Sequence, residues 1–233
     1  LGGSSANFNV GSLSTNGTLT GFHAGLYGSY TMGASYLALN ETFSAYNNQT
    51  TRKAGGYALM PYEQLSASFG STEFRTRLEG GHTLLMGGLK ATPFVAAEIA
   101  AYQSNYFAEK STIVASTFAL KNNGQAVNSL PSFIGLRLSN GYTLANGWRV
   151  APIGSVAYVH EFFPQRQFTN ILMSMPGADF NVSGPRSTYN LVQTKLGAQL
   201  NLTNQFALFS NFQGEFSSMS QSYGGMTGVK YWW

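Results

Sequence analysis

Histidine is the residue type in this 233-residue chain best suited to chemistry, because it serves as a general base and a metal ligand near neutral pH. His23, His82 and His160 lie in three separate segments, and none belongs to an H-x-x-H or H-E-x-x-H pattern. The chain also lacks cysteine, which excludes a disulfide scaffold and a thiolate metal site. We therefore expect no metal site and no cofactor.

His160 and Glu161 are adjacent in the sequence YVHEF, and two interpretations are open. They could form an acid–base pair, or His160 could lie on the outer side of a strand and Glu161 on the inner side. Neighbouring residues of a strand point to opposite faces, which favours the second interpretation. The G-x-S-x-G pattern of an esterase is absent. The sequence therefore predicts that the protein is not an enzyme.

The composition narrows the class of protein that carries these residues. Charged residues make up 9% of the chain, against roughly 25% in ordinary soluble domains. Aromatic residues reach 14%, which argues against disorder. The net charge of +4 comes without any basic run beyond Arg52-Lys53, so nucleic acid is not an expected partner. No apolar stretch is long enough to predict a transmembrane helix.

Apolar and polar residues alternate along about ten segments, which is the pattern of half-buried strands. These segments are 1–10, 21–30, 36–46, 74–84, 89–106, 132–138, 148–162, 191–202, 206–216 and 226–233, with 65–70 as a further piece of the fourth strand beyond a bulge. Their connections alternate between short turns and long loops, the long ones being 11–20, 47–63, 108–130, 164–187 and 217–225. Outer-membrane barrels pair short periplasmic turns with longer extracellular loops. The sequence thus predicts an all-β, up-and-down antiparallel transmembrane barrel forming a single domain, 1–233.

Nearly every charge in the strands falls on the face opposite the aliphatic residues. We expect these side chains to line the lumen: Arg75, Arg77, Glu79, Glu98, Arg137, Glu161, Lys195, Glu215 and Lys230. A soluble sandwich would show a similar alternation. Charges of both signs mixed with Gly, Asn and Gln favour a hydrated lumen, in which the acidic side chains pair with the basic ones, Arg137 with Glu161 among them. Glu41 breaks the pattern, and it marks either a bulge or the loop end of its strand.

Aromatic residues gather near the ends of the predicted strands, where amphipathic rings occupy the two membrane interfaces. The interface residues we expect are Tyr30, Tyr36, Trp148, Tyr158 and Trp232. The alternative is that Tyr and Phe are there because they favour strands. The predicted strand middles are rich in Ala, Val, Leu and Gly, which supports the interface interpretation.

An ordered series of sequence pieces resembles the translocator domain of monomeric autotransporters, which belong to type V secretion in Gram-negative bacteria. The pieces include LPSFIGLRLS, YVHEF, FNVSGP and the terminal GGMTGVKYWW. The resemblance implies a pore that anchors and exports an N-terminal passenger, with its long loops extracellular. It also implies a family barrel of twelve strands, of which this chain aligns from the third onward, without the first two strands and the helix that threads the pore.

The resemblance further implies which molecules the domain meets. They are outer-membrane lipids, the β-barrel assembly machinery and the passenger segment of the same protein. The assembly machinery would recognise a C-terminal signal formed by Val229, Tyr231 and Trp233. Two alternatives remain open: a plain outer-membrane channel or adhesin-type barrel without a passenger, and a soluble all-β binding module.

Overall fold

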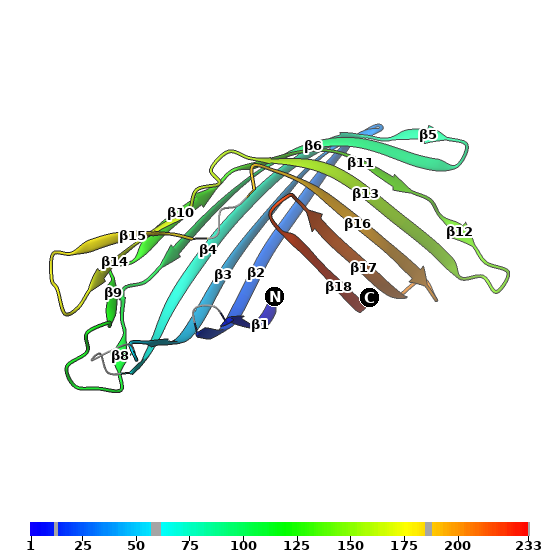
Figure 1. Ribbon diagram of the computed structural model, residues 1–233. Coiled ribbons are helices and arrows are strands. Elements are labelled where there is room, and N and C mark those ends of the chain that lie inside the picture. The colour runs from blue at the N-terminus through cyan, green and yellow to red at the C-terminus, as the bar shows by residue number, and fades with distance from the viewer. Residues whose placement is uncertain (12–13, 57–61, 185–187, 233) are drawn as a thin grey trace.

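The computed structural model describes residues 1–11, 14–56, 62–184 and 188–232. Ten strands form one antiparallel path in which each strand pairs with its neighbours along the chain. They are β1 (Gly2–Val10), β2 (Thr15–Met32), β3 (Ser35–Ala54), β4 (Glu63–His82), β6 (Leu89–Ser104), β11 (Pro131–Ser139), β13 (Arg149–Glu161), β16 (Asn190–Asn201), β17 (Phe206–Phe216) and β18 (Gln221–Tyr231). This sheet curls into an open trough, with β1 and β18 at its two edges (Figure 1). The expected all-β, up-and-down antiparallel architecture is confirmed.

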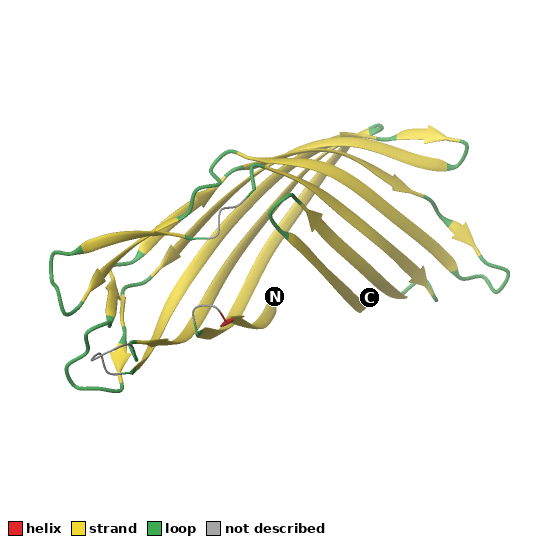
Figure 2. Cartoon of the chain, viewed as in Figure 1, coloured by secondary structure: helices red, strands yellow, loops and turns green. Residues whose placement is uncertain are grey.

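Short strands extend the sheet or build on its loop end. Four of them pair with strands of the path: β5 (Leu84–Met86), β8 (Lys110–Ser111), β10 (Gln125–Ser129) and β12 (Tyr142–Thr143). A separate four-stranded sheet has the order β15 (Asp179–Ser183), β14 (Gln167–Leu172), β9 (Leu120–Asn122) and β7 (Phe107–Ala108). Strands and loops make up almost all of the chain (Figure 2). The described part of the chain contains no helix with the length and hydropathy that crossing a bilayer requires.

The strands extend further toward the loop end than the sequence predicts. β2 begins at Thr15 and β3 continues to Ala54, so much of the expected loops 11–20 and 47–63 is paired strand. The expected bulge after 65–70 is wrong, because β4 pairs with β3 without a break from Glu63 to His82. β18 likewise begins at Gln221, inside the expected loop 217–225. The prediction followed the apolar alternation, which ends where the outer face becomes polar, whereas backbone pairing continues beyond that point.

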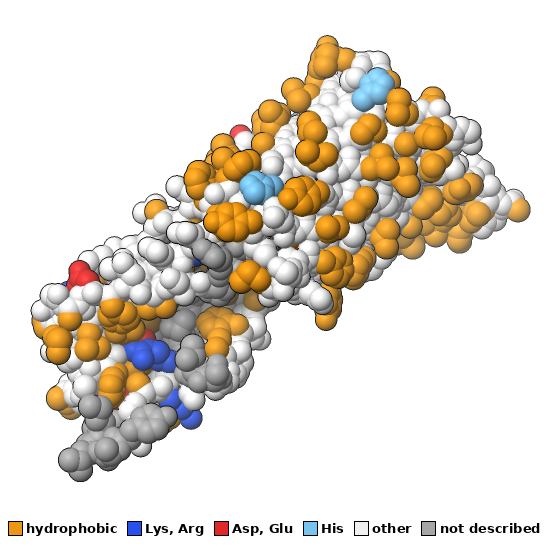
Figure 3. All heavy atoms as spheres, turned by 45° about the horizontal axis from the view of Figure 1, so that its top comes forward, with side chains coloured by type: hydrophobic (Ala, Val, Ile, Leu, Met, Phe, Trp, Pro, Cys, Tyr) orange, Lys and Arg blue, Asp and Glu red, His pale blue; other side chains and the backbone are white. Residues whose placement is uncertain are grey.

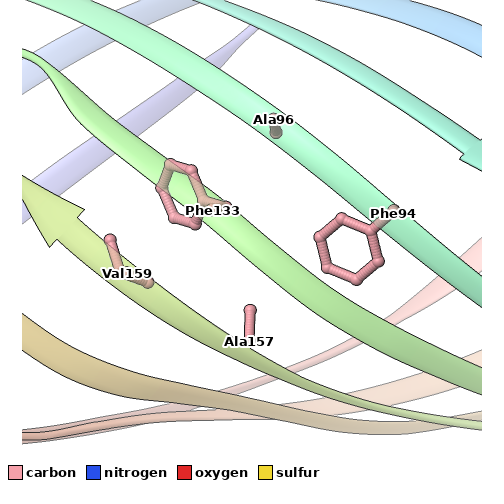
Figure 4. Close-up of a cluster of buried hydrophobic side chains, with 5 residues drawn as sticks. All are labelled: Phe94, Ala96, Phe133, Ala157 and Val159. Carbon is pink, nitrogen blue, oxygen red and sulfur yellow. The ribbon is translucent and has the colours of Figure 1, made fainter.

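The two faces of the curled sheet differ in side-chain type. Outward-facing positions carry exposed apolar residues, and Figure 3 shows hydrophobic side chains gathered densely over the upper right part of this surface. The inward face of β6, β11 and β13 holds a cluster of buried side chains (Figure 4): Phe94, Ala96, Phe133, Ala157 and Val159. The curvature therefore places a small apolar core inside the trough, beside the charged residues described next.

Candidate functional site

The inward face of β4 carries four charged side chains at alternate positions. Glu73, Arg75, Arg77 and Glu79 all point into the trough, because residues two apart in a strand share a face. Glu98 of β6 lies directly opposite Arg77 in the antiparallel register. The alternation that the sequence shows therefore becomes a row of charges along one strand, with a partner on the next strand.

Ion pairs join this row into a network. Arg75 Nη1 lies 2.6 Å from Glu98 Oε1, and Arg75 Nη2 also contacts Glu73. Arg77 Nη2 lies 2.9 Å from Glu79 Oε2, and its Nη1 lies 3.8 Å from Glu98 Oε2. Each carboxylate of the network therefore meets at least one guanidinium. Charges in a partly hydrated interior are stable when they are paired in this way.

The curvature of the sheet brings a distant strand into the network. Glu79 Oε1 accepts hydrogen bonds from Tyr36 Oη of β3 at 2.7 Å and from Arg137 Nη2 of β11 at 2.7 Å. Arg137 Nη1 also donates to Tyr36 Oη at 3.1 Å. Two strands, β4 and β6, lie between β3 and β11. A flat sheet would therefore hold the backbones of Tyr36 and Arg137 roughly 14 Å apart. Such contacts require the concave side, which fixes the direction of the whole charged face.

Tyr36 was expected among the outer interface aromatics, and the structure corrects this prediction. The sequence placed it with the outer rings, but its hydroxyl group lies between Glu79 and Arg137 inside the trough. The alternation of β3 explains the error, because Tyr36 is out of phase with the outward-facing Leu37 and Leu39. Its position beside a turn does not determine the face.

Aromatic rings form part of the inner wall beneath the cations. The guanidinium of Arg77 lies 4.0 Å from the ring centroid of Phe133, and that of Arg137 lies 5.0 Å from the ring of Phe94. A guanidinium over a ring face gains electrostatic attraction while its N–H groups remain available to carboxylates. The inner wall therefore combines paired charge with apolar support, and it is not purely polar.

The other expected luminal charges lie on the inward face but in different surroundings. Lys195 lies opposite Ser155 and Gln213 in the register. Glu215 accepts hydrogen bonds from Gln193 Nε2 at 2.9 Å and from Gln213 Nε2 at 3.2 Å. A cavity of about 540 Å³ opens beside them, and its wall includes Arg137, Lys195, Gln213 and Glu215. The half of the trough formed by β13 and β16–β18 thus holds polar side chains beside an open cavity, whose wall also includes the apolar residues Ile153 and Met226.

Two of the expected luminal charges, Glu161 and Lys230, lie apart from the ion-pair network. Glu161 does not pair with Arg137, since these residues lie opposite Pro131 and Ser155 respectively, six residues apart along the strands. The Glu161 carboxylate instead accepts hydrogen bonds from the hydroxyl group of Ser129 and from the backbone N–H groups of residues 130 and 163. Lys230 Nζ donates to Gln199 Oε1 at 3.0 Å.

The expected outer aromatics and the C-terminal residues lie at exposed positions. Tyr30 and Tyr158 point outward from β2 and β13, and Trp148 lies in the hairpin before β13. Val229 and Tyr231 point outward from β18, and Trp232 is exposed just after that strand. Trp233 lies outside the described residues.

Glu41 lies in the middle of the outer face. The sequence offered a bulge or the loop end as explanations, and the register contradicts both, because β3 pairs with β2 and β4 without a break. Glu41 lies opposite Leu26 and Thr76, and its outward-facing neighbours along β3 are Leu39 and Phe43. A single carboxyl group therefore sits within the apolar outer surface.

Sequence reasoning missed a second group of charges, at the loop end of β3 and β4. Arg52 donates to both carboxylate oxygens of Glu109, at 2.7 and 2.6 Å, and to the carbonyl oxygen of Phe118. Glu63 is fully buried and accepts hydrogen bonds from the Ser111 and Ser116 hydroxyl groups and from the Thr117 backbone N–H. Two carboxylates thereby hold the segment 109–120 against the sheet. Sequence reasoning also missed Glu73 of the inward row. Glu73 has the same parity as Arg75, and that signal could have identified it.

The pKa of Glu63 is lowered in the folded protein. Burial alone would raise the pKa of this carboxyl group, but the hydrogen bonds from Ser116, Thr117 and Ser111 outweigh it. Glu63 begins β4, eleven residues before the outward-facing Phe74, and so lies beyond the apolar part of that strand. A carboxyl group whose folded pKa lies below its ordinary value of 4.5 stabilises the fold above that value.

We expect the segment 109–120 to loosen as the pH falls below about 4.5 and through the folded pKa of Glu63, because the protonated carboxyl loses acceptor strength. Hydrogen exchange of this segment at a series of pH values measures the effect. Glu63→Gln should weaken the segment at neutral pH and remove that part of the pH dependence. An unchanged pH profile in Glu63→Gln would contradict the role given to this carboxylate.

Comparison with known proteins gives three findings. The family model described as autotransporter beta-domain matches residues 1–213. The fold is similar to the translocator domain of autotransporter NalP from Neisseria meningitidis, with a TM-score of 0.72 and 17% identity over 94% of this chain and 69% of that chain. It is also similar to the beta domain of the Bordetella autotransporter BrkA, with a TM-score of 0.62 and 18% identity over 97% of this chain and 78% of that chain. Comparison with curated protein sequences found no match.

Proposed function

Because the chain belongs to the autotransporter beta-domain family, and is thereby an outer-membrane translocator domain for passenger export, we propose that its charged inward face lines the path of the passenger. Domains of this family reside in the outer membrane of Gram-negative bacteria and act as transport pores, with a passenger segment attached. The observation that carries the proposal is the ion-pair network from Tyr36 through Glu79 to Arg137, which crosses four strands on the concave side.

The network suits a path for an unfolded chain because its charges are already satisfied. An extended polypeptide presents backbone N–H and C=O groups, which need water or polar neighbours along the way. Paired arginine and glutamate side chains offer such neighbours without leaving an isolated charge that would bind the passenger strongly. The open cavity beside Lys195 and Glu215 supports a hydrated passage on the other half of the trough.

The remaining features of the proposal concern the surroundings of the domain. Residues 1–233 would act as one unit, with Arg75, Arg77, Glu79, Glu98, Arg137, Glu161, Lys195, Glu215 and Lys230 facing water in the lumen. The long connections would lie outside the cell, with the outward apolar residues and the aromatics Tyr30, Trp148, Tyr158 and Trp232 contacting lipid. The assembly machinery would recognise Val229, Tyr231 and Trp233, and the domain would carry no enzymatic activity. The support is the alternation of faces and the grouping of long connections at one end.

A pair of cysteine variants tests the passage, since the chain has no cysteine of its own. Ser155 lies between Arg137 and Lys195 on the inward face, and Val156 points outward from the same strand. The two variants, made in the full-length protein, are Ser155→Cys and Val156→Cys. We expect a water-soluble thiol reagent to label Ser155→Cys and not Val156→Cys in intact membranes. A stalled passenger should then protect Ser155→Cys. Equal labelling of both variants, or no protection, would contradict the proposed path.

Glu41 gives a second test of the lipid-facing surface. A carboxyl group within the lipid-facing band costs less than the roughly 2–4 kcal/mol of a central Lys or Arg, but it remains unfavourable. We expect Glu41→Leu to stabilise the folded barrel by about 1–2 kcal/mol, measured as a higher temperature of the heat-induced mobility shift. Asn40→Leu, on the inward face of the same strand, is the control and should give no such gain. A lower transition temperature for Glu41→Leu would show that the carboxyl has a stabilising partner.

A further inference from the structure

A polar row crosses the outer face where β11, β13 and β16 approach the loop end. Ser132, His160 and Asn190 lie directly opposite one another in the antiparallel register. The previous row of the same face, toward the turns, is Ile134, Tyr158 and Val192. The outer surface thus changes from apolar to polar within one step along the strands.

Hydrogen bonds and ring contacts organise this row into a cluster. Tyr158 Oη donates to Asn190 Oδ1 at 2.6 Å, and His160 Nδ1 lies 2.7 Å from the same oxygen. The imidazole ring of His160 contacts the ring of Phe162 edge-on, with centroids 4.8 Å apart, and lies 6.5 Å from that of Tyr189 at a stacked angle of 28°. We call Tyr158, His160, Phe162, Tyr189 and Asn190 the rim cluster.

The hydrogen bonds determine what the rim cluster offers to a ligand. Because the carbonyl oxygen of Asn190 can only accept, His160 donates from Nδ1, and in the neutral imidazole ring Nε2 then carries a lone pair. Among the described residues, neither His160 Nε2 nor the Asn190 amide nitrogen has a hydrogen-bond partner. The cluster therefore presents one acceptor and one donor side by side, framed by the half-exposed rings of Phe162 and Tyr158.

The depth of the cluster follows from the strand that carries it. His160 lies eleven residues after Arg149, where β13 begins at the turn end. A transmembrane strand needs about 9–11 residues to cross the hydrocarbon layer. If the domain has the orientation given under its proposed function, on which this inference rests, the rim cluster lies at the level of the lipid headgroups outside the cell.

We propose that the rim cluster binds the sugar headgroup of a glycolipid in the outer leaflet. A sugar hydroxyl group both donates and accepts, so it complements His160 Nε2 and the Asn190 amide together. A phosphate oxygen only accepts, and it would meet the lone pair of Nε2. The aromatic rings offer apolar surface to the C–H face of a pyranose, as amphipathic rings do at membrane interfaces.

Two variants separate a sugar site from an ordinary aromatic belt. His160→Phe and Asn190→Leu keep the outer face apolar or aromatic but remove the polar groups. The full-length protein, purified from outer membranes, is transferred to nanodiscs containing lipopolysaccharide and phosphatidylethanolamine, and retained lipid is quantified by native mass spectrometry. We expect each variant to retain at least about fivefold less lipopolysaccharide, as the loss of one hydrogen bond of roughly 1 kcal/mol implies. Val156→Ala, outward-facing but outside the cluster, is the control and should retain it as the parent does.

Further arms identify the ligand. An anionic phospholipid in place of lipopolysaccharide should bind the parent and the variants equally. Retention by His160→Phe and Asn190→Leu at the level of the parent overturns the proposal, as does a stronger loss of the phospholipid than of lipopolysaccharide. All variants must show the heat-modifiable shift of a folded barrel, and if one does not, the other answers the question. A parent protein that fails to insert at all would instead contradict the membrane function.

Discussion

Leu196→Arg is expected to prevent most of the protein from reaching a folded state in the outer membrane. Leu196 points outward from β16, is 60% exposed and lies five residues from the turn end of its strand, near the middle of the outer apolar surface. An arginine on the lipid face near the midplane costs about 2–4 kcal/mol. That cost lowers the folded fraction roughly 30- to 1000-fold relative to competing states, which a marginally stable barrel cannot tolerate.

The matched control uses the same substitution three residues away. Gln193 points inward, and its side chain already donates a hydrogen bond to Glu215. An arginine at position 193 keeps that acidic partner, so Gln193→Arg should insert nearly as well as the parent. Both variants of the full-length protein are compared by membrane fractionation and by the heat-modifiable band on a gel. Equal insertion of the two variants would show that the assignment of the two faces is mistaken.

Removal of Tyr231, Trp232 and Trp233 should lower the amount of assembled barrel at least about tenfold. Tyr231 is the last residue of β18 and pairs with Phe206, and the backbone N–H of Trp232 donates to the carbonyl oxygen of Gln205 at 2.9 Å. The deletion removes both backbone pairing and the exposed rings that we propose to anchor the strand at the interface and to contact the assembly machinery. The assembled fraction is read from the heat-modifiable band in outer membranes.

The control for this deletion separates the rings from the charge beside them. Lys230→Gln changes an inward side chain that donates to Gln199, and it should leave assembly near the level of the parent. Tyr231→Phe keeps the ring and its backbone pairing, and it should behave likewise. A normal level of assembled barrel after the three-residue deletion would refute the proposed role of the C-terminus.

Tyr36 and Glu41 show that the parity of a residue in its strand predicts its face, whereas its closeness to the end of the strand does not. The period-two alternation assigned Arg75, Arg77 and Glu98 to one face because successive strand residues point to opposite sides. Parity was available for Tyr36 as well, and the tyrosine was misplaced because its position near a turn was weighed instead. Glu41 shows the same lesson, since its alternation placed it on the outer face and the structure keeps it there.

Contacts between strands that are not neighbours could not be predicted from the sequence. Arg137 was expected to pair with Glu161 on the polar face, yet the register separates them by six residues. Arg137 instead reaches Glu79 and Tyr36, and only the curvature of the sheet makes that possible. The loop pairs of Glu63 with Ser116 and of Arg52 with Glu109 are also non-local and follow no repeat.

By itself, the sequence determined the number of main strands, their antiparallel order and which side chains share a face. These properties depend on local alternation and on the lengths of the connections, and both are visible in the sequence. Only the tertiary structure decided which charges pair, how far the strands continue past the apolar surface, and which aromatic rings point inward. Register and curvature set those contacts, because they place residues from distant strands within hydrogen-bonding distance.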